Sequence, residues 1–107
     1  MIYEHRAYFV LPGRKKALLD RFANHTMALF ERHGIQVVGF WDTEIGDSTE
    51  VIYICAYPNI EHRMKAWAAF RADPEWQKAA ADSEKDGPIV ARVEAKIMTA
   101  TDFSPLK

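Results

Sequence analysis

The chain has 107 residues, 49% of them hydrophobic, a content that fits a packed globule and argues against disorder. Its 14 basic and 15 acidic residues give a net charge of −1, which carries no electrostatic signal for nucleic acid or an anionic membrane. The length predicts one domain over residues 1–107, and no apolar run approaches the length of a transmembrane helix.

The first half of the chain alternates between strand and helix signals. Ile2 to Val10 is rich in aromatic and β-branched residues and ends at a Pro-Gly turn, which predicts a strand. Arg14 to His33 is predicted as an amphipathic helix, because eight of its residues fall within an arc of about 140°: Leu18, Leu19, Phe22, Ala23, Thr26, Leu29, Phe30 and His33. Gly34 follows as the left-handed residue that ends such a helix.

Two further strands and a divided helix follow. Gln36 to Glu44 and Val51 to Tyr57 are predicted as strands joined by a hairpin at Gly46-Asp47-Ser48. Asn59 can cap a helix from Ile60 to Ala72, in which Ile60, Met64, Trp67 and Ala68 form an apolar stripe that we expect in the core.

A second helical piece begins at Asp73-Pro74-Glu75, where Asp is the N-cap and Pro takes the first helical position. The helical signal weakens near Lys85, and Gly87-Pro88 ends the helix. Trp76 is expected either to fold the piece over the sheet edge or to form part of a pocket lid. Val90 to Met98 is predicted as the last strand.

The resulting order, βαββαβ, predicts an α+β fold of the ferredoxin-like type. Such a fold has a four-stranded antiparallel sheet with its helices on one face. The other face must then meet solvent or a partner. In the strand from Val51 to Tyr57 both faces are apolar, whereas a solvated face normally alternates with polar residues. We therefore expect a homodimer formed through sheet faces, the alternative being a monomer with an apolar open sheet.

Several segments resemble the NIPSNAP family, and they occur in order over nearly the whole chain. They are IYEHRAYFVLPGRKKAL (residues 2–18), ERHGIQVVGFWDTEIG (31–46), ICAY (54–57), RADPEWQ (71–77) and DFSP (102–105). The resemblance implies a dimeric α/β barrel, in which two ferredoxin-like sheets close face to face and each subunit keeps a pocket. Relatives in that superfamily include cofactor-free monooxygenases, haem-degrading and chlorite-decomposing enzymes, and small isomerases, whereas the NIPSNAP branch has no well-defined reaction.

The chain departs from the family pattern at three positions. His5 stands where the family usually has Leu, and Tyr53 and Cys55 stand where it often has His and Trp. If the family pocket uses that His or Trp, this chain has altered it.

Glu4, Arg6 and Tyr8 share one face of the first strand and match the family's Tyr-Glu-x-Arg-x-Tyr opening. Arg6 can hold a carboxylate in bidentate fashion, and Tyr8 can donate to a carbonyl oxygen or an oxyanion. Both are candidate ligand-binding residues. The alternative is an ion pair of Glu4 with Arg6, or across subunits, that fixes strand register.

Trp41, Tyr53, Cys55 and Tyr57 are expected either to line an aromatic pocket on the barrel side of the sheet or to be ordinary barrel core. Nothing in the sequence suggests a lowered pKa for Cys55, so a nucleophilic role is not expected.

The four histidines show no i, i+4 pair and no Cys cluster, so no metal site is expected. His33 is either a packed, hydrogen-bonded residue at the helix end or a ligand-binding residue and base facing the pocket. His62 is the other residue considered for haem ligation, but no motif supports it, and no cofactor is expected.

Three functions remain open. The first is a homodimer that binds a small apolar or aromatic ligand without catalysis, and the second is a small cofactor-free monooxygenase or isomerase. Haem binding through His62 or His33 is the third. The single cysteine favours a reducing compartment, and the charged residues within the first apolar stretch argue against a signal peptide. A cytoplasmic location is expected, with no nucleic-acid or membrane partner.

Overall fold

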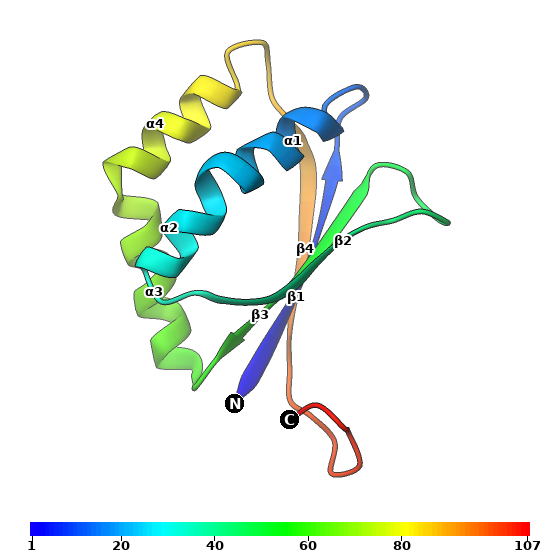
Figure 1. Ribbon diagram of the computed structural model, residues 1–107, viewed down its shortest axis with the longest axis vertical. Coiled ribbons are helices and arrows are strands. Elements are labelled where there is room, and N and C mark those ends of the chain that lie inside the picture. Colours follow the sequence, from blue (N-terminus) through cyan, green and yellow to red (C-terminus); the bar gives the residue numbers. More distant parts are fainter.

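The computed structural model describes residues 1–107 as a four-stranded sheet with all helices on one face (Figure 1). The elements in chain order are β1 (Ile2–Val10), α1 (Lys15–Arg21), η1 (Phe22–Thr26), α2 (Met27–Arg32), β2 (Gln36–Asp42), β3 (Glu50–Tyr57), α3 (Ile60–Ala72), α4 (Pro74–Ser83) and β4 (Val90–Met98). The antiparallel sheet has the strand order β2-β3-β1-β4, which confirms the ferredoxin-like α+β fold. No helix is long and apolar enough to cross a membrane.

The helix from residue 14 to 33 is predicted as continuous, but it contains one wide π turn. The segments α1, η1 and α2 follow one another without a break, and η1 is π-helical over Phe22–Thr26. Within it the Thr26 hydroxyl donates to the Arg21 carbonyl at 3.3 Å. A 3.6-residue periodicity cannot reveal such a turn, because one turn shifts the helical register without removing apolar residues.

The caps of the second helical region follow the sequence. The Asn59 side chain accepts from the backbone N–H of His62 at 2.9 Å, and the Asp73 side chain accepts from that of Glu75 at 2.9 Å. Pro74 takes the first position of α4, where it has no N–H to leave unpaired.

The expected apolar stripe of α3 is only partly buried. Trp67 is buried, but Ile60 and Met64 are 47% and 62% exposed, and Ala68 is exposed as well. The reason is that α3 buries Ala66, Trp67 and Phe70, so its buried face is rotated from the predicted stripe.

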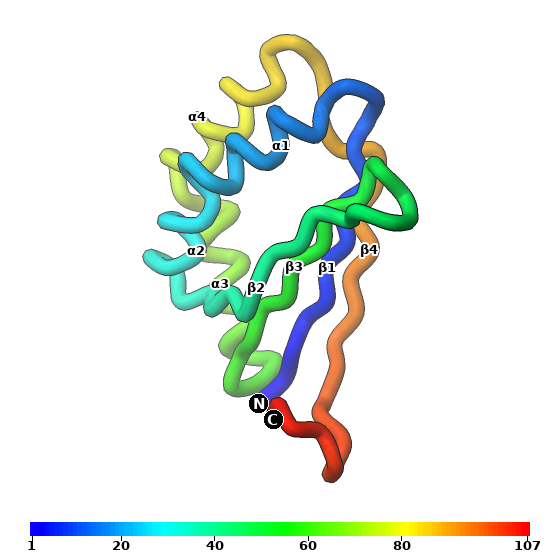
Figure 2. Tube along the Cα trace, turned by 45° about the vertical axis from the view of Figure 1, so that its right-hand side comes forward, coloured from blue at the N-terminus to red at the C-terminus, as the bar shows by residue number.

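The sheet has two faces of different character. The helices cover β2, β3 and β1, whereas β4 runs at the edge farther from them (Figure 2). The register places Val51, Tyr53, Cys55 and Tyr57 under the helices and leaves Ile52, Ile54 and Ala56 on the opposite face. The main core therefore lies between the helices and the aromatic side of β3.

Candidate functional site

Strand β1 presents Glu4, Arg6 and Tyr8 to the helices, as strand periodicity predicts. The neighbouring β3 places Cys55 beside Glu4 and Tyr53 beside Arg6. Two polar groups therefore lie under the helices, one centred on Glu4 and one on Arg6.

Glu4 is fully buried, yet both of its carboxylate oxygens are bonded. Oε1 accepts from the Tyr57 hydroxyl at 2.7 Å and from Arg63 Nε at 3.0 Å. Oε2 accepts from Arg63 Nη2 at 2.7 Å and from Arg6 Nη1 at 3.1 Å. Burial alone would raise the pKa of Glu4, but hydrogen bonds from Arg63 and Tyr57 and the charge of Arg6 outweigh it and lower the pKa. Glu4 is therefore ionised at neutral pH and anchors both arginines.

Arg6 lies on the sheet with three of its donors engaged. Its Nε donates to the Tyr53 hydroxyl at 2.7 Å and its Nη2 to the Tyr8 hydroxyl at 3.2 Å, in addition to the bond to Glu4. The Tyr8 and Tyr53 hydroxyls are themselves 3.2 Å apart. A guanidinium group has five N–H donors, so one N–H on each terminal nitrogen of Arg6 remains for a ligand.

A cavity of about 190 Å³ opens above this group, between the sheet and the helices. Six of the ten lining residues are aromatic: Tyr8, Phe22, Phe30, Trp67, Phe70 and Trp76. Three are arginines, Arg6, Arg21 and Arg71, and the tenth is Thr26. The lining thus combines flat apolar walls with a few strongly polar groups, which is typical of small-molecule sites.

The π turn η1 shapes one wall of this cavity. It supplies Phe22 and Thr26 directly, and Arg21 precedes it. Isolated π turns inside α-helices occur frequently at functional sites, because the extra residue re-aims the side chains around it.

Arg21 is only 8% exposed and is incompletely paired. Its Nη1 donates to Ser83 Oγ at 3.2 Å and lies 3.6 Å from a carboxylate oxygen of Glu84. Its Cζ lies 5.3 Å from the centre of the Trp76 ring. The Nε–H is buried and has no hydrogen-bond partner, a rare state for a charged group.

Arg71, at the end of α3, is exposed and makes no ion pair within 4.0 Å. Its Cζ lies 5.5 Å from the centre of the Trp67 ring, and Arg6 lies over the same ring at 4.5 Å. Trp67 therefore contacts two guanidinium groups and is fixed by donating from Nε1 to the Tyr57 hydroxyl at 2.7 Å.

The structure divides the predicted aromatic residues between the two sheet faces. The expectation that Tyr53 and Tyr57 face the barrel side is wrong: both are fully buried under the helices. The physical reason is that Phe22, Phe30 and Phe40 pack around the Tyr53 ring, which makes this side of β3 the core side.

Trp41 lies on the opposite, open face of the sheet. It pairs with Ile52, is 51% exposed, and its ring covers Gly39, where a Cβ would come within 2.8 Å of it. The predicted residues thus form no single site: Arg6 and Tyr8 line the cavity, Tyr53 supports them from below, and Trp41 is elsewhere.

The two histidines considered in the sequence lie outside the cavity lining. His33 Nε2 is 2.7 Å from Asp73 Oδ2, and His62 Nε2 is 2.8 Å from the Gly34 carbonyl oxygen. His33, at the end of α2, is thus bonded to the residue between α3 and α4, and His62 of α3 is bonded to the loop that follows α2. No group of three or more His, Cys, Asp or Glu side chains is arranged to hold a metal ion.

The residues that sequence reasoning missed are Arg21, Arg71, Phe22, Phe30 and Phe70. Arg21 lies just outside the apolar arc of an ideal helix, where an exposed head group is the ordinary expectation. Arg71 follows Trp67 by four residues, so the spacing does indicate a cation–π pair on one helix face.

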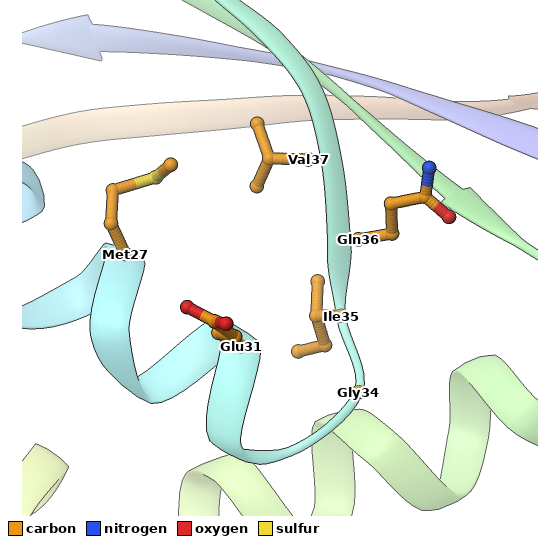
Figure 3. A pocket seen from close by; sticks show the side chains of 6 residues that line it. All are labelled: Met27, Glu31, Gly34, Ile35, Gln36 and Val37. Atoms are coloured by element: carbon orange, nitrogen blue, oxygen red, sulfur yellow. The ribbon is translucent and has the colours of Figure 1, made fainter.

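A larger hollow, of about 390 Å³, lies between α2 and the start of β2 (Figure 3). Figure 3 shows Met27 and Val37 facing one another across it, with Glu31 at its side. Glu31 is its one ionisable group, and Met27 is 39% exposed. This hollow offers little that would orient a ligand, so the smaller cavity is the better candidate site.

Similarity to known proteins identifies the family to which the chain belongs. The NIPSNAP family model matches residues 3–105. The chain belongs to the NIPSNAP family. The putative NipSnap protein K02D10.1 of Caenorhabditis elegans is 27% identical over 106 residues, which are 99% of this chain and 19% of the worm protein. The chain therefore spans about a fifth of that relative's length.

Solved structures agree with this placement. A NIPSNAP family protein of unknown function, Atu4242 from Agrobacterium tumefaciens, superimposes with a TM-score of 0.88 at 30% identity, covering 100% of this chain and 94% of that one. SnoaB, a cofactor-independent oxygenase from Streptomyces nogalater, superimposes with a TM-score of 0.63 at 18% identity, covering 97% and 96%. At that identity the likeness to SnoaB shows the fold alone.

Proposed function

We propose that this NIPSNAP protein binds a small aromatic molecule in the cavity between its sheet and helices. The observation that carries the proposal is the lining itself, in which five aromatic rings accompany Arg6 and Tyr8. An apolar cavity of roughly 150 Å³ can hold benzene, so a cavity of about 190 Å³ suits a molecule with one ring and a small polar substituent.

Binding is better supported than catalysis. Burial raises the pKa of Tyr53 well above its usual value and that of Cys55 to about 11, so both stay protonated at neutral pH. No carboxylate or histidine lines the cavity. A general base poised near neutral pH is therefore missing among the lining residues.

A cofactor-free monooxygenase or isomerase is the second candidate. The observation in its favour is that Arg6 and Tyr8 line the cavity side by side, with Tyr53 bonded behind them at 2.7 Å and 3.2 Å. The free N–H groups of Arg6 and the Tyr8 hydroxyl would stabilise an oxyanion on a bound ring. Turnover of an identified ligand that is lost in Tyr8→Phe, with binding retained, would favour this candidate over binding alone.

The binding proposal is tested by filling the cavity. Thr26 is 2% exposed and lines it, so Thr26→Met would place additional atoms in the space. Thr26→Val is the matched control, because it adds no volume and, like Thr26→Met, loses the hydroxyl that donates to the Arg21 carbonyl. Thermal unfolding would be followed with a panel of neutral and charged single-ring compounds, because a ligand of the folded state raises the midpoint. We expect at least one compound to stabilise the native protein and Thr26→Val but not Thr26→Met. No stabilisation by any compound, or equal stabilisation of Thr26→Met, contradicts the proposal.

We also propose that two copies pair through their open sheet faces. The face is apolar at Ile52, Ile54 and Trp41, and β4 adds both signs of charge, with Arg92 beside Glu94. A surface of mixed charge can complement itself across a two-fold axis, so a second copy is the occupant that fits.

The test of the pairing is the mass in solution. Sedimentation equilibrium of the native protein should give the dimer mass at micromolar concentration. Ile54→Asp should give the monomer, because it buries a charge in the interface. Ile45→Asp is the matched control, since Ile45 is 98% exposed in the β2–β3 hairpin and should leave the dimer unchanged. A native monomer at this concentration overturns the pairing.

A further inference from the structure

We infer that the ligand of the helix–sheet cavity is a compact aromatic carboxylate whose anionic group is bound by Arg21 and Arg71. The inference rests on the proposed function and names the chemical class that it would accept.

The charge around the cavity is the first observation. Arg6, Arg21 and Arg71 line it, and no carboxylate does. Glu4 is not among the lining residues, and it forms ion pairs with both Arg6 and Arg63. One carboxylate therefore faces two guanidinium groups. The only other carboxylate within 4.0 Å of these lining arginines is Glu84, which lies 3.6 Å from Arg21 and is 48% exposed on its side chain. Four guanidinium groups thus face two carboxylates, and the excess positive charge is at the cavity.

The unpaired donors are the second observation. The Nε–H of Arg21 is buried without a partner, and Arg71 has no carboxylate within 4.0 Å. A buried charged donor without an acceptor is costly, and a carboxylate oxygen is the acceptor that a guanidinium group binds best. An anion in the cavity that Arg21 and Arg71 line would supply such an acceptor.

The third observation is that each of these arginines is held against an aromatic ring. Arg21 lies over Trp76, and Arg71 lies over Trp67. Trp76 in turn lies 4.6 Å from the Phe70 ring. Stacking on tryptophan restricts the guanidinium plane without consuming its N–H donors, so the donors stay available along the edge of the plane. The phenylalanine rings of the lining, Phe22, Phe30 and Phe70, would pack on the flat body of an aromatic acid.

Benzoate and benzamide are the probes, because they share shape and differ in charge. Calorimetric titration at pH 7 should show benzoate binding at least roughly tenfold tighter than benzamide, the difference expected for a charged rather than a neutral hydrogen-bond partner. Arg71→Gln should weaken benzoate by roughly tenfold and leave benzamide unchanged. Arg71 is exposed, so this change should not disturb folding. Arg21→Lys, which keeps the charge but loses the unpaired Nε–H, should weaken benzoate as well.

Arg32→Gln is the control, since Arg32 is exposed, lies outside the cavity and loses the same charge. If Arg32→Gln and Arg71→Gln weaken benzoate equally, the effect is general electrostatics and the inference fails. It also fails if benzamide binds as tightly as benzoate. It fails likewise if neither binds while another aromatic compound stabilises the native protein but not Thr26→Met. In those two outcomes the proposed cavity function stands. Failure of every compound, charged or neutral, would remove that function instead.

Discussion

Glu4→Gln is the substitution that tests most directly how the site is held together. Glu4 is fully buried and accepts four hydrogen bonds, three of them from Arg63 and Arg6. Glutamine has nearly the same shape, but it carries no charge and presents an NH₂ donor to arginines that can only donate. The packing is kept while the electrostatic partner is removed.

The expected loss is large because Arg6 remains behind. The Arg6 side chain is 11% exposed and would lose its only carboxylate, whereas Arg63 is 26% exposed and can recover part of its hydration. Removing one partner of a buried pair costs about 3–5 kcal/mol, and the exposure of Arg63 places this case near the lower end, about 3 kcal/mol. For a domain of this size that corresponds to a fall in melting temperature of roughly 13 °C.

Urea unfolding at pH 7, followed by circular dichroism, measures this loss. Glu31→Gln is the control, because Glu31 is exposed and should change stability by less than about 0.5 kcal/mol. A loss at Glu4 no larger than that of the control would refute the assignment of Glu4 as the anchor of both arginines.

The pH dependence of the loss identifies its cause. The pKa of Glu4 is lower in the folded than in the unfolded state, so the ionised carboxylate stabilises the fold fully above the unfolded pKa, about 4.3. That contribution is lost as the pH falls through the lower, folded pKa. The unfolding free energies of the native protein and Glu4→Gln should therefore converge below about pH 4. A difference that stays constant from pH 7 into acid would indicate a packing effect instead of a charge effect.

Three further outcomes follow from the structure. Cys55 is fully buried and its pKa is raised to about 11, so a thiol reagent at pH 8 should react only after denaturation; reaction within minutes in the native state contradicts this. Gly34→Ala and Gly13→Ala should each cost about 1 kcal/mol in urea unfolding, since both glycines have φ of +76°, and no loss at either would contradict the strain argument. Gly39→Ala should displace the Trp41 ring and weaken the dimer by roughly tenfold, as measured by sedimentation; an unchanged dimer would place Trp41 outside the interface.

Much of the fold follows from local signals in the sequence. The bounds of β1, α3 and β4 coincide with the predicted residues 2–10, 60–72 and 90–98. Pro-Gly and Gly-Pro turns, the caps at Asn59 and Asp73, and β-branched runs are all short-range features, so one sequence is enough to interpret them.

The sequence could not decide which face of β3 the helices cover. Both faces are apolar, and strand periodicity separates two sets of residues without saying which set is inside. The choice is made by tertiary packing of Phe22 and Phe30 on Tyr53. The barrel-side position expected for Tyr53 and Tyr57 was wrong for this reason.

The candidate site was predicted in part. Strand periodicity placed Arg6 and Tyr8 on one face, and both line the cavity. Arg21 and Arg71 were missed because their roles depend on the π turn and on contacts between helices distant in sequence, such as Arg21 with Trp76. Periodicity along a single element does not contain that information.

The location of bound benzoate decides whether the cavity between helices and sheet is the ligand site. The chain has three tryptophans: Trp67 and Trp76 line the cavity, and Trp41 lies on the open sheet face. Fluorine NMR of protein labelled with 5-fluorotryptophan therefore reports both surfaces in one titration with benzoate. Binding in the cavity should give saturable shifts of the Trp67 and Trp76 signals and an unchanged Trp41 signal. A shift of the Trp41 signal alone would place the ligand on the open sheet face and contradict binding in the cavity.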